Sequence, residues 1–546
     1  MMHITQGLRR AVRVNAQGIA TIDGERRTTW QEFANQVARL AGGLVSLGLK
    51  PDDRVAMLAL NSDRHLAYYF ATIWAGGIFV PLNTRLAPPE LGHILNDAGA
   101  SILVVDDVLQ SHLAQILKHT SAPIHIIFAG NGKPLAELIH HETFIANAEP
   151  LPDANRGGDD VATIIYTGGT TGLSKGVMLT HNNAVSNALS MVPFMYDGDP
   201  WLFLHAAPMF HIADSQWNTG VTMLGGTHVF SQKFVPEEVL ALIGQHQITH
   251  TALVPTMINM LCNVPNAKSY DVSTLRKVNF GGSSIAPAVI RRARDLFPTC
   301  QFIQGYGQTE TSPAISMLPD KYNTDEGPYA GKIESAGQPV FSMEVRIFDL
   351  NDEEVPNGTV GEIVTKGPNV MLGYWNKPEE TAVALRGGWM HTGDVGYVDD
   401  DGFIFIVDRL KDMIISGGEN VYSTEVEHVI YQHTAVADCA VIGIPHEKWG
   451  EAVHAIVRPK QGVTLTEEEI RNHCRQHIAG YKCPRSVEIR PRAAPSSSAR
   501  IFRRRPARPA RSDLRRQRRR PQPLLCQRLR EAEGRQPGLL LRAVHL

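Results

Sequence analysis

Short apolar runs alternate with helical patterns along roughly the first 280 residues of the chain. The first helix is predicted over residues 29–47, with Thr29 as its N-cap. The apolar face of this helix carries Phe33, Val37, Leu40, Ala41 and Leu44. Strand-like runs that alternate with helices indicate a mostly parallel α/β sheet. The predicted strands are Val55–Leu60, Ile102–Val105, Val161–Ile165, Phe203–Ala207, Thr227–Phe230, His250–Val254 and Lys277–Phe280.

From about residue 337 the pattern changes to shorter strands separated by turn residues. Strands are predicted at Glu344–Asp349 and Gly361–Thr365, and a solvated turn is predicted at residues 399–402. This segment indicates a β-rich subdomain. A smaller α+β unit follows it, with a strand at Ala440–Ile444 and a helix from about Thr466 to His477.

The chain is therefore predicted to be an α/β protein of several subdomains, because its 546 residues exceed what one core usually supports. We expect a large N-terminal domain of stacked, mostly parallel sheets, with the β-rich part, over residues 1–409. A small, mobile α+β domain is expected over residues 410–490. Residues 491–546 form a tail rich in arginine and proline, and we expect it to be disordered.

The composition is ordinary for a globular protein. No run of about 18 apolar residues predicts a membrane span, and the first residues lack a secretory pattern. The six cysteines have no CxxC spacing, which argues against a disulfide framework and a zinc site. We expect a reducing cytoplasm as the location. Peripheral contact with a membrane and assembly as a homodimer both stay open.

The net charge of −2 conceals a split between the body of the chain and its tail. From residue 491 onward there are 16 arginines, no lysine and 3 acidic residues. Removing these from the totals of 53 basic and 55 acidic residues leaves residues 1–490 at about −15. The body is acidic and the tail is strongly basic.

Residues 166–177 are the most informative stretch, because small residues and hydroxyls directly follow a predicted strand. Glycines let backbone N–H groups face a common point, and hydroxyls and a lysine add donors and charge. Such a loop suits phosphate, although it is not a Walker A loop, since that motif needs adjacent Gly-Lys-Ser/Thr. The alternative is a glycine-rich surface turn. The phosphate-binding candidates are Thr167, Gly168, Gly169, Thr170, Thr171, Gly172 and Lys175.

Further polar segments follow predicted strands, as expected if one ligand lies at the carboxyl ends of a sheet. In the segment that contains Tyr306, Thr309 and Glu310, an aromatic ring, a hydroxyl and a carboxylate suit a purine, a phosphate oxygen and Mg²⁺. Asp394 is suited to ribose hydroxyls. Taken singly, each segment is as well explained by a turn, and His211 by an ordinary core or surface histidine.

The ordered set of segments resembles the adenylate-forming superfamily of acyl-CoA synthetases, aryl-CoA ligases, luciferases and nonribosomal adenylation domains. The resemblance runs from about Gln31 to Arg490 and includes residues 81–86 and Gly373-Tyr374-Trp375. The Gly-Gly-Thr-Thr-Gly form of the phosphate loop resembles that of bacterial fatty-acyl-CoA synthetases. The resemblance implies that a carboxylate attacks the α-phosphate of ATP and that a thiol, usually CoA, then displaces AMP.

The resemblance also implies roles for individual residues. The phosphate loop with Lys175 would hold the β- and γ-phosphates, Thr309 would contact the α-phosphate, and Glu310 would bind Mg²⁺. His211 would lie between the acyl pocket and the nucleotide. The adenine and ribose would contact Gly281, Gly282, Ser283, Gly305, Tyr306, Gly307, Gln308, Asp394 and Arg409.

For the second half-reaction, the resemblance implies that the small domain rotates about a hinge at Lys411. Ser416, Gly417 and Gly418 would line the pantetheine tunnel, and Trp449 and Lys482 would lie near the CoA nucleotide.

The tail departs from the family pattern, which should continue after Arg485 with a strand and a late lysine that bridges the carboxylate and the α-phosphate. Lys482 is instead the last lysine of the chain. The tail could be a basic arm for nucleic acid or anionic lipid, an ordinary disordered extension, or the product of a reading-frame shift in a GC-rich gene. We favour the frameshift, because it explains the lost pattern, the missing lysine and the charge reversal together.

The expected function is that of an AMP-forming carboxylate–CoA ligase that uses ATP, Mg²⁺ and CoA, with no nucleic-acid partner. Fatty acids are the expected substrates, and aromatic or cyclic carboxylates are the alternative. A third hypothesis is a catalytically impaired nucleotide- or acyl-binding protein that lacks the late lysine.

Overall fold

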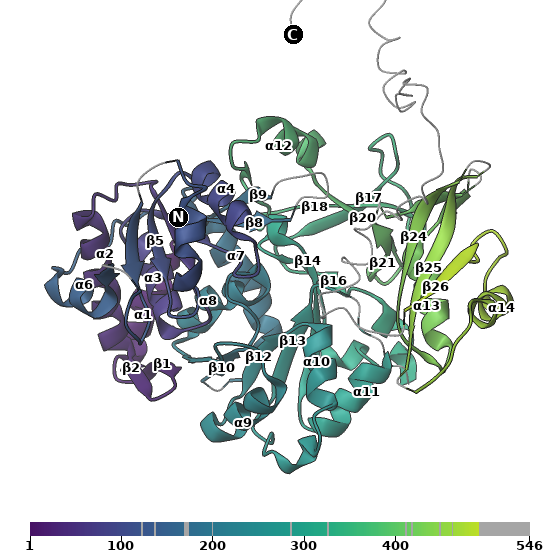
Figure 1. Ribbon diagram of the computed structural model, residues 1–546, viewed down its shortest axis with the longest axis horizontal. Coiled ribbons are helices and arrows are strands. Elements are labelled where there is room, and N and C mark those ends of the chain that lie inside the picture. Colours follow the sequence, from purple (N-terminus) through teal and green to yellow (C-terminus); the bar gives the residue numbers. More distant parts are fainter. Residues whose placement is uncertain are drawn as a thin grey trace, which may run out of the picture.

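The computed structural model describes residues 1–490, apart from 122–123, 136–137, 169–173, 199, 284, 286, 325–326, 410–411, 417–418, 447–448 and 461. At residues 409, 415, 419, 420 and 450 it describes the backbone alone. Two large sheets, a four-stranded sheet and a smaller C-terminal unit make up this part of the chain (Figure 1).

The first large sheet has nine strands and is mostly parallel. In spatial order its strands are β16 (Gln338–Pro339), β15 (Ala314–Leu318), β14 (Gln301–Gly307), β13 (Lys277–Gly281), β12 (His250–Leu253), β10 (Leu202–His205), β11 (Thr227–Phe230), β1 (Ile19–Asp23) and β2 (Arg26–Thr29).

The second large sheet has eight strands. In spatial order they are β19 (Gly373–Tyr374), β9 (Lys175–Thr180), β8 (Val161–Thr167), β4 (Ile78–Pro81), β3 (Arg54–Leu58), β5 (Ala100–Val105), β6 (His125–Phe128) and β7 (Ile139–His140). Successive residues of β5 face different cores, Ile102 and Val104 on one side and Leu103 and Val105 on the other. Burial on both faces explains the unbroken apolar run.

Helices fill the space between the two large sheets and cover their outer faces. Helix α3 (Asp63–Trp74) contacts β4 of one sheet and β11 of the other, and α7 (His181–Met195) contacts β9 and β15. The remaining helices of the large domain are α1 (Ile4–Asn15), α2 (Trp30–Ser46), α4 (Pro88–Ala98), α5 (Leu113–Leu117), α6 (His141–Asn147), α8 (Ile212–Leu224), α9 (Pro236–His246), α10 (Pro255–Cys262), α11 (Pro287–Leu296) and α12 (Pro378–Ala384).

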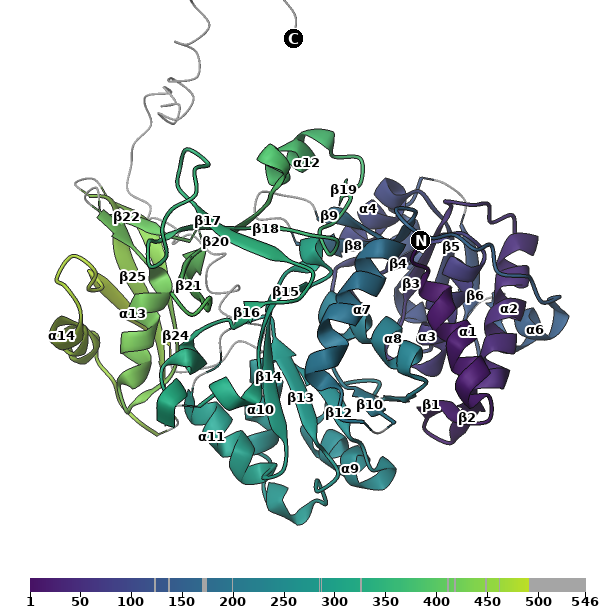
Figure 2. The ribbon, with the colours of Figure 1, turned by 180° about the vertical axis from the view of Figure 1, so that it is seen from behind.

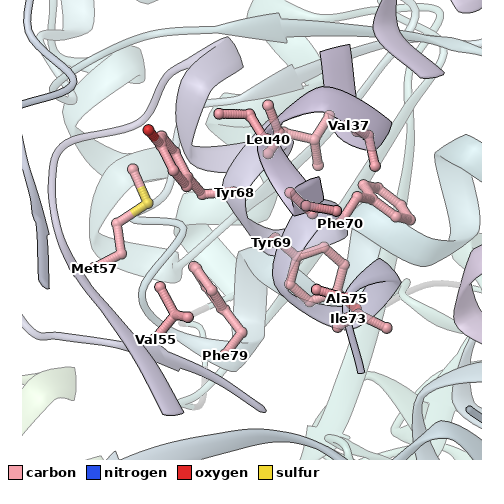
Figure 3. Close-up of a cluster of buried hydrophobic side chains, with 14 of the residues drawn as sticks. Val37, Leu40, Val55, Met57, Tyr68, Tyr69, Phe70, Ile73, Ala75 and Phe79 are labelled. Carbon is pink, nitrogen blue, oxygen red and sulfur yellow. The ribbon is translucent and has the colours of Figure 1, made fainter. Parts of the chain in front are cut away.

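Helix α2 confirms the helix predicted over residues 29–47. Thr29 caps it and forms a capping box with Glu32, and the five predicted apolar positions are buried. Two of them, Val37 and Leu40, pack beside α3 in a core that also contains Tyr68 and Phe70 (Figure 3).

A four-stranded antiparallel sheet follows, formed by β17 (Glu344–Phe348), β18 (Gly361–Lys366), β20 (Met390–Val398) and β21 (Ile404–Arg409). The predicted turn at residues 399–402 joins β20 to β21. Asp399 and Asp401 in this turn accept hydrogen bonds from Lys332 Nζ at 2.5 and 2.7 Å.

The small C-terminal unit has its own five-stranded sheet and core, and it lies at one end of the molecule in both ribbon views (Figure 2). The predicted strand at 440–444 lies within β24, and the predicted helix corresponds to α14, which Thr466 caps. The elements are β22 (Ile414–Ser416), β23 (Glu419–Val421), α13 (Ser423–Gln432), β24 (Val436–His446), β25 (Gly450–Pro459), α14 (Glu467–His477) and β26 (Ser486–Ile489). The predicted fold class, a large domain of mostly parallel sheets and a small α+β domain, is confirmed.

Candidate functional site

The predicted phosphate loop joins two antiparallel neighbours, β8 and β9. Thr167 ends β8 and lies opposite Lys175, the first residue of β9. The pairing of the strands therefore holds both ends of the loop. Gly168 is described at the loop entry, whereas the predicted phosphate ligands Gly169, Thr170, Thr171 and Gly172 lie outside the described residues.

Lys175 and Glu310 are far apart in the sequence, but both lie beside the same tyrosine. The Tyr374 hydroxyl donates a 2.9 Å hydrogen bond to Glu310 Oε1, and Lys175 Nζ lies 5.0 Å from the centre of the Tyr374 ring. The pKa of Tyr374 is raised mainly by burial and secondly by the charge of Glu310. The phenol therefore stays protonated and donates. The predicted phosphate cation and the predicted Mg²⁺ ligand thus share a neighbour.

The predicted adenine segments form the carboxyl ends of two adjacent parallel strands. Gly281 of β13 is in register with Gly305 of β14, and a Cβ at Gly281 would lie 2.4 Å from the Gly305 carbonyl oxygen. A Cβ at Gly307 would lie 1.7 Å from the Pro313 carbonyl oxygen. Close backbone approach therefore requires these glycines. Gly282 has a left-handed backbone (φ +83°) and precedes Ser283.

The predicted ribose ligand Asp394 lies beside the same strand ends. The Tyr306 hydroxyl donates to Asp394 Oδ2 at 2.9 Å, and the Gln308 side chain donates to the Thr392 carbonyl oxygen at 3.4 Å. Asp394 is also in register with Arg409, of which only the backbone is described. The four-stranded sheet thus supplies the aspartate, and the nine-stranded sheet supplies the aromatic ring.

Thr309 and Glu310 lie in a 3₁₀ turn, Thr309–Thr311, that directly continues from β14. The Met371 N–H donates to the Glu310 carbonyl oxygen at 2.9 Å, which ties this turn to the segment before β19. Lys175, Glu310, Thr309, Tyr306 and Asp394 therefore follow one path across the junction of three sheets.

His211 precedes α8 and is exposed, with its ring 4.5 Å from that of Phe210. The next residue, Ile212, lines a narrow cavity of about 30 Å³ between α8, α3 and β8. Ile165 of β8 and Ser312 line the same cavity. It therefore borders the segments that carry His211, the phosphate loop and Glu310.

A buried network of polar side chains, which the sequence did not predict, joins α8 to two neighbouring strands. Asp214 Oδ1 and His205 Nδ1 are 2.5 Å apart, and His205 Nε2 is 2.9 Å from His228 Nδ1. The network ends at Thr222, whose hydroxyl is 3.0 Å from His228 Nε2. Burial, and next the neighbouring His205, lower the pKa of His228 well below its usual value, so it stays neutral. This network connects α8 to β10 and β11.

The predicted CoA residues lie in the small unit, and the described contacts do not join them to each other. Lys482 Nζ binds both carboxylate oxygens of Glu425 at 2.7 and 2.9 Å. The Trp449 ring lies 5.2 Å from the Arg485 guanidinium, and Ser416 is buried. Lys411, Gly417 and Gly418 lie outside the described residues.

Within the described residues, no group of three or more His, Cys, Asp or Glu side chains is arranged to hold a metal ion. A lone Glu310 fits Mg²⁺, which takes one or two protein carboxylates and completes its shell with phosphate and water oxygens. In the same part of the chain, no helix is long and apolar enough to cross a membrane.

Comparison with known proteins places the chain in a family. The AMP-binding enzyme model matches residues 8–375, and the AMP-binding enzyme C-terminal domain model matches residues 425–498. Feruloyl-CoA synthase of Amycolatopsis sp is 40% identical over 494 residues, which cover 90% of this chain and 96% of that protein. A long-chain-fatty-acid–CoA ligase of Salmonella typhimurium is 34% identical over 493 residues, which cover 84% of this chain and 85% of that protein.

A solved structure has the same fold over almost the whole length. ATP-bound MatB from Rhodopseudomonas palustris superposes with a TM-score of 0.80 at 30% identity, over 92% of this chain and 98% of that chain. The family models, the curated relatives and the solved structure agree on the family. The chain belongs to the adenylate-forming family of AMP-binding enzymes, within which it is a carboxylate–CoA ligase.

Proposed function

We propose that this ligase activates a hydroxylated aromatic carboxylate, similar to ferulate, as an acyl-adenylate and transfers the acyl group to CoA. In the first half-reaction a carboxylate oxygen attacks the α-phosphorus of ATP, and the bond to pyrophosphate breaks. In the second, the CoA sulfur attacks the acyl carbonyl carbon and loses its proton, and AMP leaves. The boundary near residue 410 and the rotation of the small domain are part of this proposal.

The residues at the junction of the sheets supply binding and orientation. Lys175 and the phosphate loop would neutralise the terminal phosphates, and Asp394 would accept hydrogen bonds from the ribose hydroxyls. Glu310 would hold Mg²⁺, which neutralises phosphate charge when bound. Thr309 would contact the α-phosphate, and His211 would border the acyl group. Holding the carboxylate in line with phosphorus is the main demand of this chemistry.

The observation that supports an aromatic substrate is the lining of the cavity beside Ile212. The residues that line it include two with aromatic rings, Tyr69 and Phe79, and six with polar side chains, Thr163, Asn187, Ser215, Gln216, Thr219 and Ser312. Its volume of about 30 Å³ suits a hydroxyl or methoxy group at the end of a ring. A long alkyl chain would leave the buried Ser312 hydroxyl, which has no partner among the described residues, unsatisfied, and this is costly.

Ser312 is the most informative polar residue of this lining. It is 2% exposed, and its hydroxyl has no hydrogen-bond partner among the described residues. Its backbone is left-handed (φ +66°), which is uncommon for a residue other than glycine and often marks a functional position. A ring hydroxyl would give the Ser312 hydroxyl a partner.

Release of AMP with a panel of acids tests this substrate. The ratio of kcat/KM for ferulate to that for unsubstituted cinnamate should exceed 1 and fall about two- to tenfold in both Ser312→Ala and Ser312→Gly. The glycine variant relieves the left-handed backbone, so an equal effect of the two variants assigns the loss to the hydroxyl. A higher kcat/KM for palmitate than for ferulate would contradict the aromatic substrate.

Fatty acids are the second candidate. The Gly-Gly-Thr-Thr-Gly form of the phosphate loop and the similarity to the Salmonella ligase support them. The same panel separates the two candidates, because long-chain acids and ring acids are compared under one assay.

A further inference from the structure

Tyr374 is held rigidly by the elements around it. It lies on β19, in register with Val177 of β9, just beyond the end of the phosphate loop. Its backbone N–H donates to Thr381 Oγ1 at 2.9 Å, and the next residue, Trp375, donates from Nε1 to the Asp97 carbonyl oxygen at 2.9 Å. The tyrosine therefore projects from a backbone that is anchored on both sides.

The two functional groups beside Tyr374 reach it through different parts of its side chain. Glu310 accepts from the hydroxyl at the tip of the ring, and the Lys175 ammonium lies near the ring itself. Removing only the hydroxyl thus affects Glu310, whereas removing the ring affects both groups.

We propose that Tyr374 is the positioning residue that sets the spacing between the lysine for the terminal phosphates and the carboxylate for Mg²⁺. The proposal deepens the proposed function and rests on it, because it assumes that Lys175 and Glu310 bind MgATP.

The physical reason is preorganisation. A partner that hydrogen-bonds to a ligating carboxylate fixes its orientation toward the metal, and loss of such partners typically costs about 10–100-fold in metal affinity or activity. Lysine has a long flexible side chain, and ordering it costs entropy. A ring beneath the ammonium stabilises one position by about two- to fivefold in an equilibrium constant. One residue thus prepares both groups before the nucleotide arrives.

Binding of ATP in the absence of an acid substrate tests the proposal without relying on turnover. ATP affinity would be measured by calorimetry across a Mg²⁺ titration and again in excess EDTA. Tyr374→Phe should raise the Mg²⁺ concentration for half-maximal tightening about 10–100-fold. Its metal-free ATP affinity should stay within about twofold of the wild type, because the ring beneath Lys175 is kept. Tyr374→Leu should in addition weaken metal-free ATP binding about two- to fivefold.

Tyr431→Phe is the matched control. The Tyr431 hydroxyl also donates to a carboxylate, Asp438 Oδ1 at 2.7 Å, but it lies in the small unit. This variant should leave both ATP measurements unchanged. Should Tyr374→Leu fail to fold, Tyr374→Phe is sufficient for the test, since it keeps the half-buried ring.

The outcomes distinguish the proposed function from the positioning role of Tyr374. Wild-type protein that binds no ATP would refute the proposed function, and the positioning role with it. Wild-type protein that binds MgATP while Tyr374→Phe shows an unchanged Mg²⁺ dependence would refute the positioning role alone.

Discussion

At the residue scale, Asp23 is a carboxyl group in an unfavourable place for its charge. It is 6% exposed and lies near a second carboxylate, Asp63, with Arg26 bound to both at 2.5 and 2.8 Å. Burial, and next the charge of Asp63, raise the pKa of Asp23 from 3.8 to about 6. The folded protein thus holds this proton more tightly than the unfolded chain does.

The sign of the resulting pH dependence follows from linkage. The contribution of Asp23 to stability is fully present below pH 3.8 and is lost as the pH rises through about 6. Asp23→Asn should therefore gain stability relative to the wild type between pH 4 and pH 7, by up to about 3 kcal/mol. Urea unfolding at several pH values measures this difference. A difference in unfolding free energy that is constant with pH would contradict the prediction.

The candidate site shows which single residues could be predicted and which could not. Lys175, Glu310 and Asp394 lie in polar segments within or beside strands, so sequence alone could nominate them as candidates. Tyr374 belongs to a segment of the family resemblance, but no role was predicted for it. Its partner strand β9 lies about two hundred residues earlier, and side-chain contacts across such a separation leave no local pattern in the sequence. The same reason applies to Glu425, which binds Lys482.

At the scale of elements, helix α13 of the small unit is capped from outside it. Tyr422 occupies the N-cap position but provides no side-chain cap. The N–H and hydroxyl of Ser423 donate to the buried carboxylate of Asp408, a residue of β21 in the large domain. A carboxylate at a helix N-terminus satisfies free N–H groups and favours the helix dipole.

Asp408→Ala should destabilise the first turn of α13 by about 0.5–2 kcal/mol. Hydrogen exchange of the α13 amides measures the effect, and those amides should exchange faster. Thr466→Ala is the matched control, because Thr466 caps α14 from its own chain segment within a capping box. It should speed exchange in α14 and leave α13 unchanged. Equal exchange of α13 in the wild type and Asp408→Ala would show that the cap lies elsewhere.

Elements were predicted better than their junctions. The strand at Thr227–Phe230 has the predicted bounds, whereas Phe203–Ala207 ends two residues early, at His205, because Ala206 and Ala207 begin the connection to α8. Periodicity identifies strands and helices from local residues. It gave neither the antiparallel partner of β8 nor the pairing of β19 with β9, since both depend on tertiary packing.

At the scale of the whole molecule, the proposed function implies that the two half-reactions depend on different parts of the chain. Lys482 is the last lysine, and Glu425 already binds it through both oxygens. The match to the C-terminal family model ends at residue 498, and the tail after residue 490 lies outside the described residues. The sequence has no later lysine that could take the bridging role that the family resemblance implies.

ATP–pyrophosphate exchange by the chain as written should therefore be about 10²–10³-fold slower than in a chimera that carries the C-terminal segment of the related feruloyl-CoA synthase. Thioester formation from a preformed acyl-adenylate and CoA should be similar in both proteins, because the proposed function assigns that lysine no role in this step. Equal exchange rates would contradict the role assigned to it. Sequencing the 3′ end of the gene decides whether a frameshift produced the tail.

Three sheets contribute side chains to the candidate site, and this arrangement determines which substitutions would inactivate the enzyme. No single sheet contains all the residues of the proposed site, so catalysis depends on how the three sheets pack against one another. A substitution at Gly337 or Gly396, where an added Cβ would collide with the carbonyl oxygen of Met317 or Phe405, would shift a strand and impair the chemistry without contacting any substrate. Proximity to the reacting atoms is thus a poor guide to which inherited changes disable this ligase.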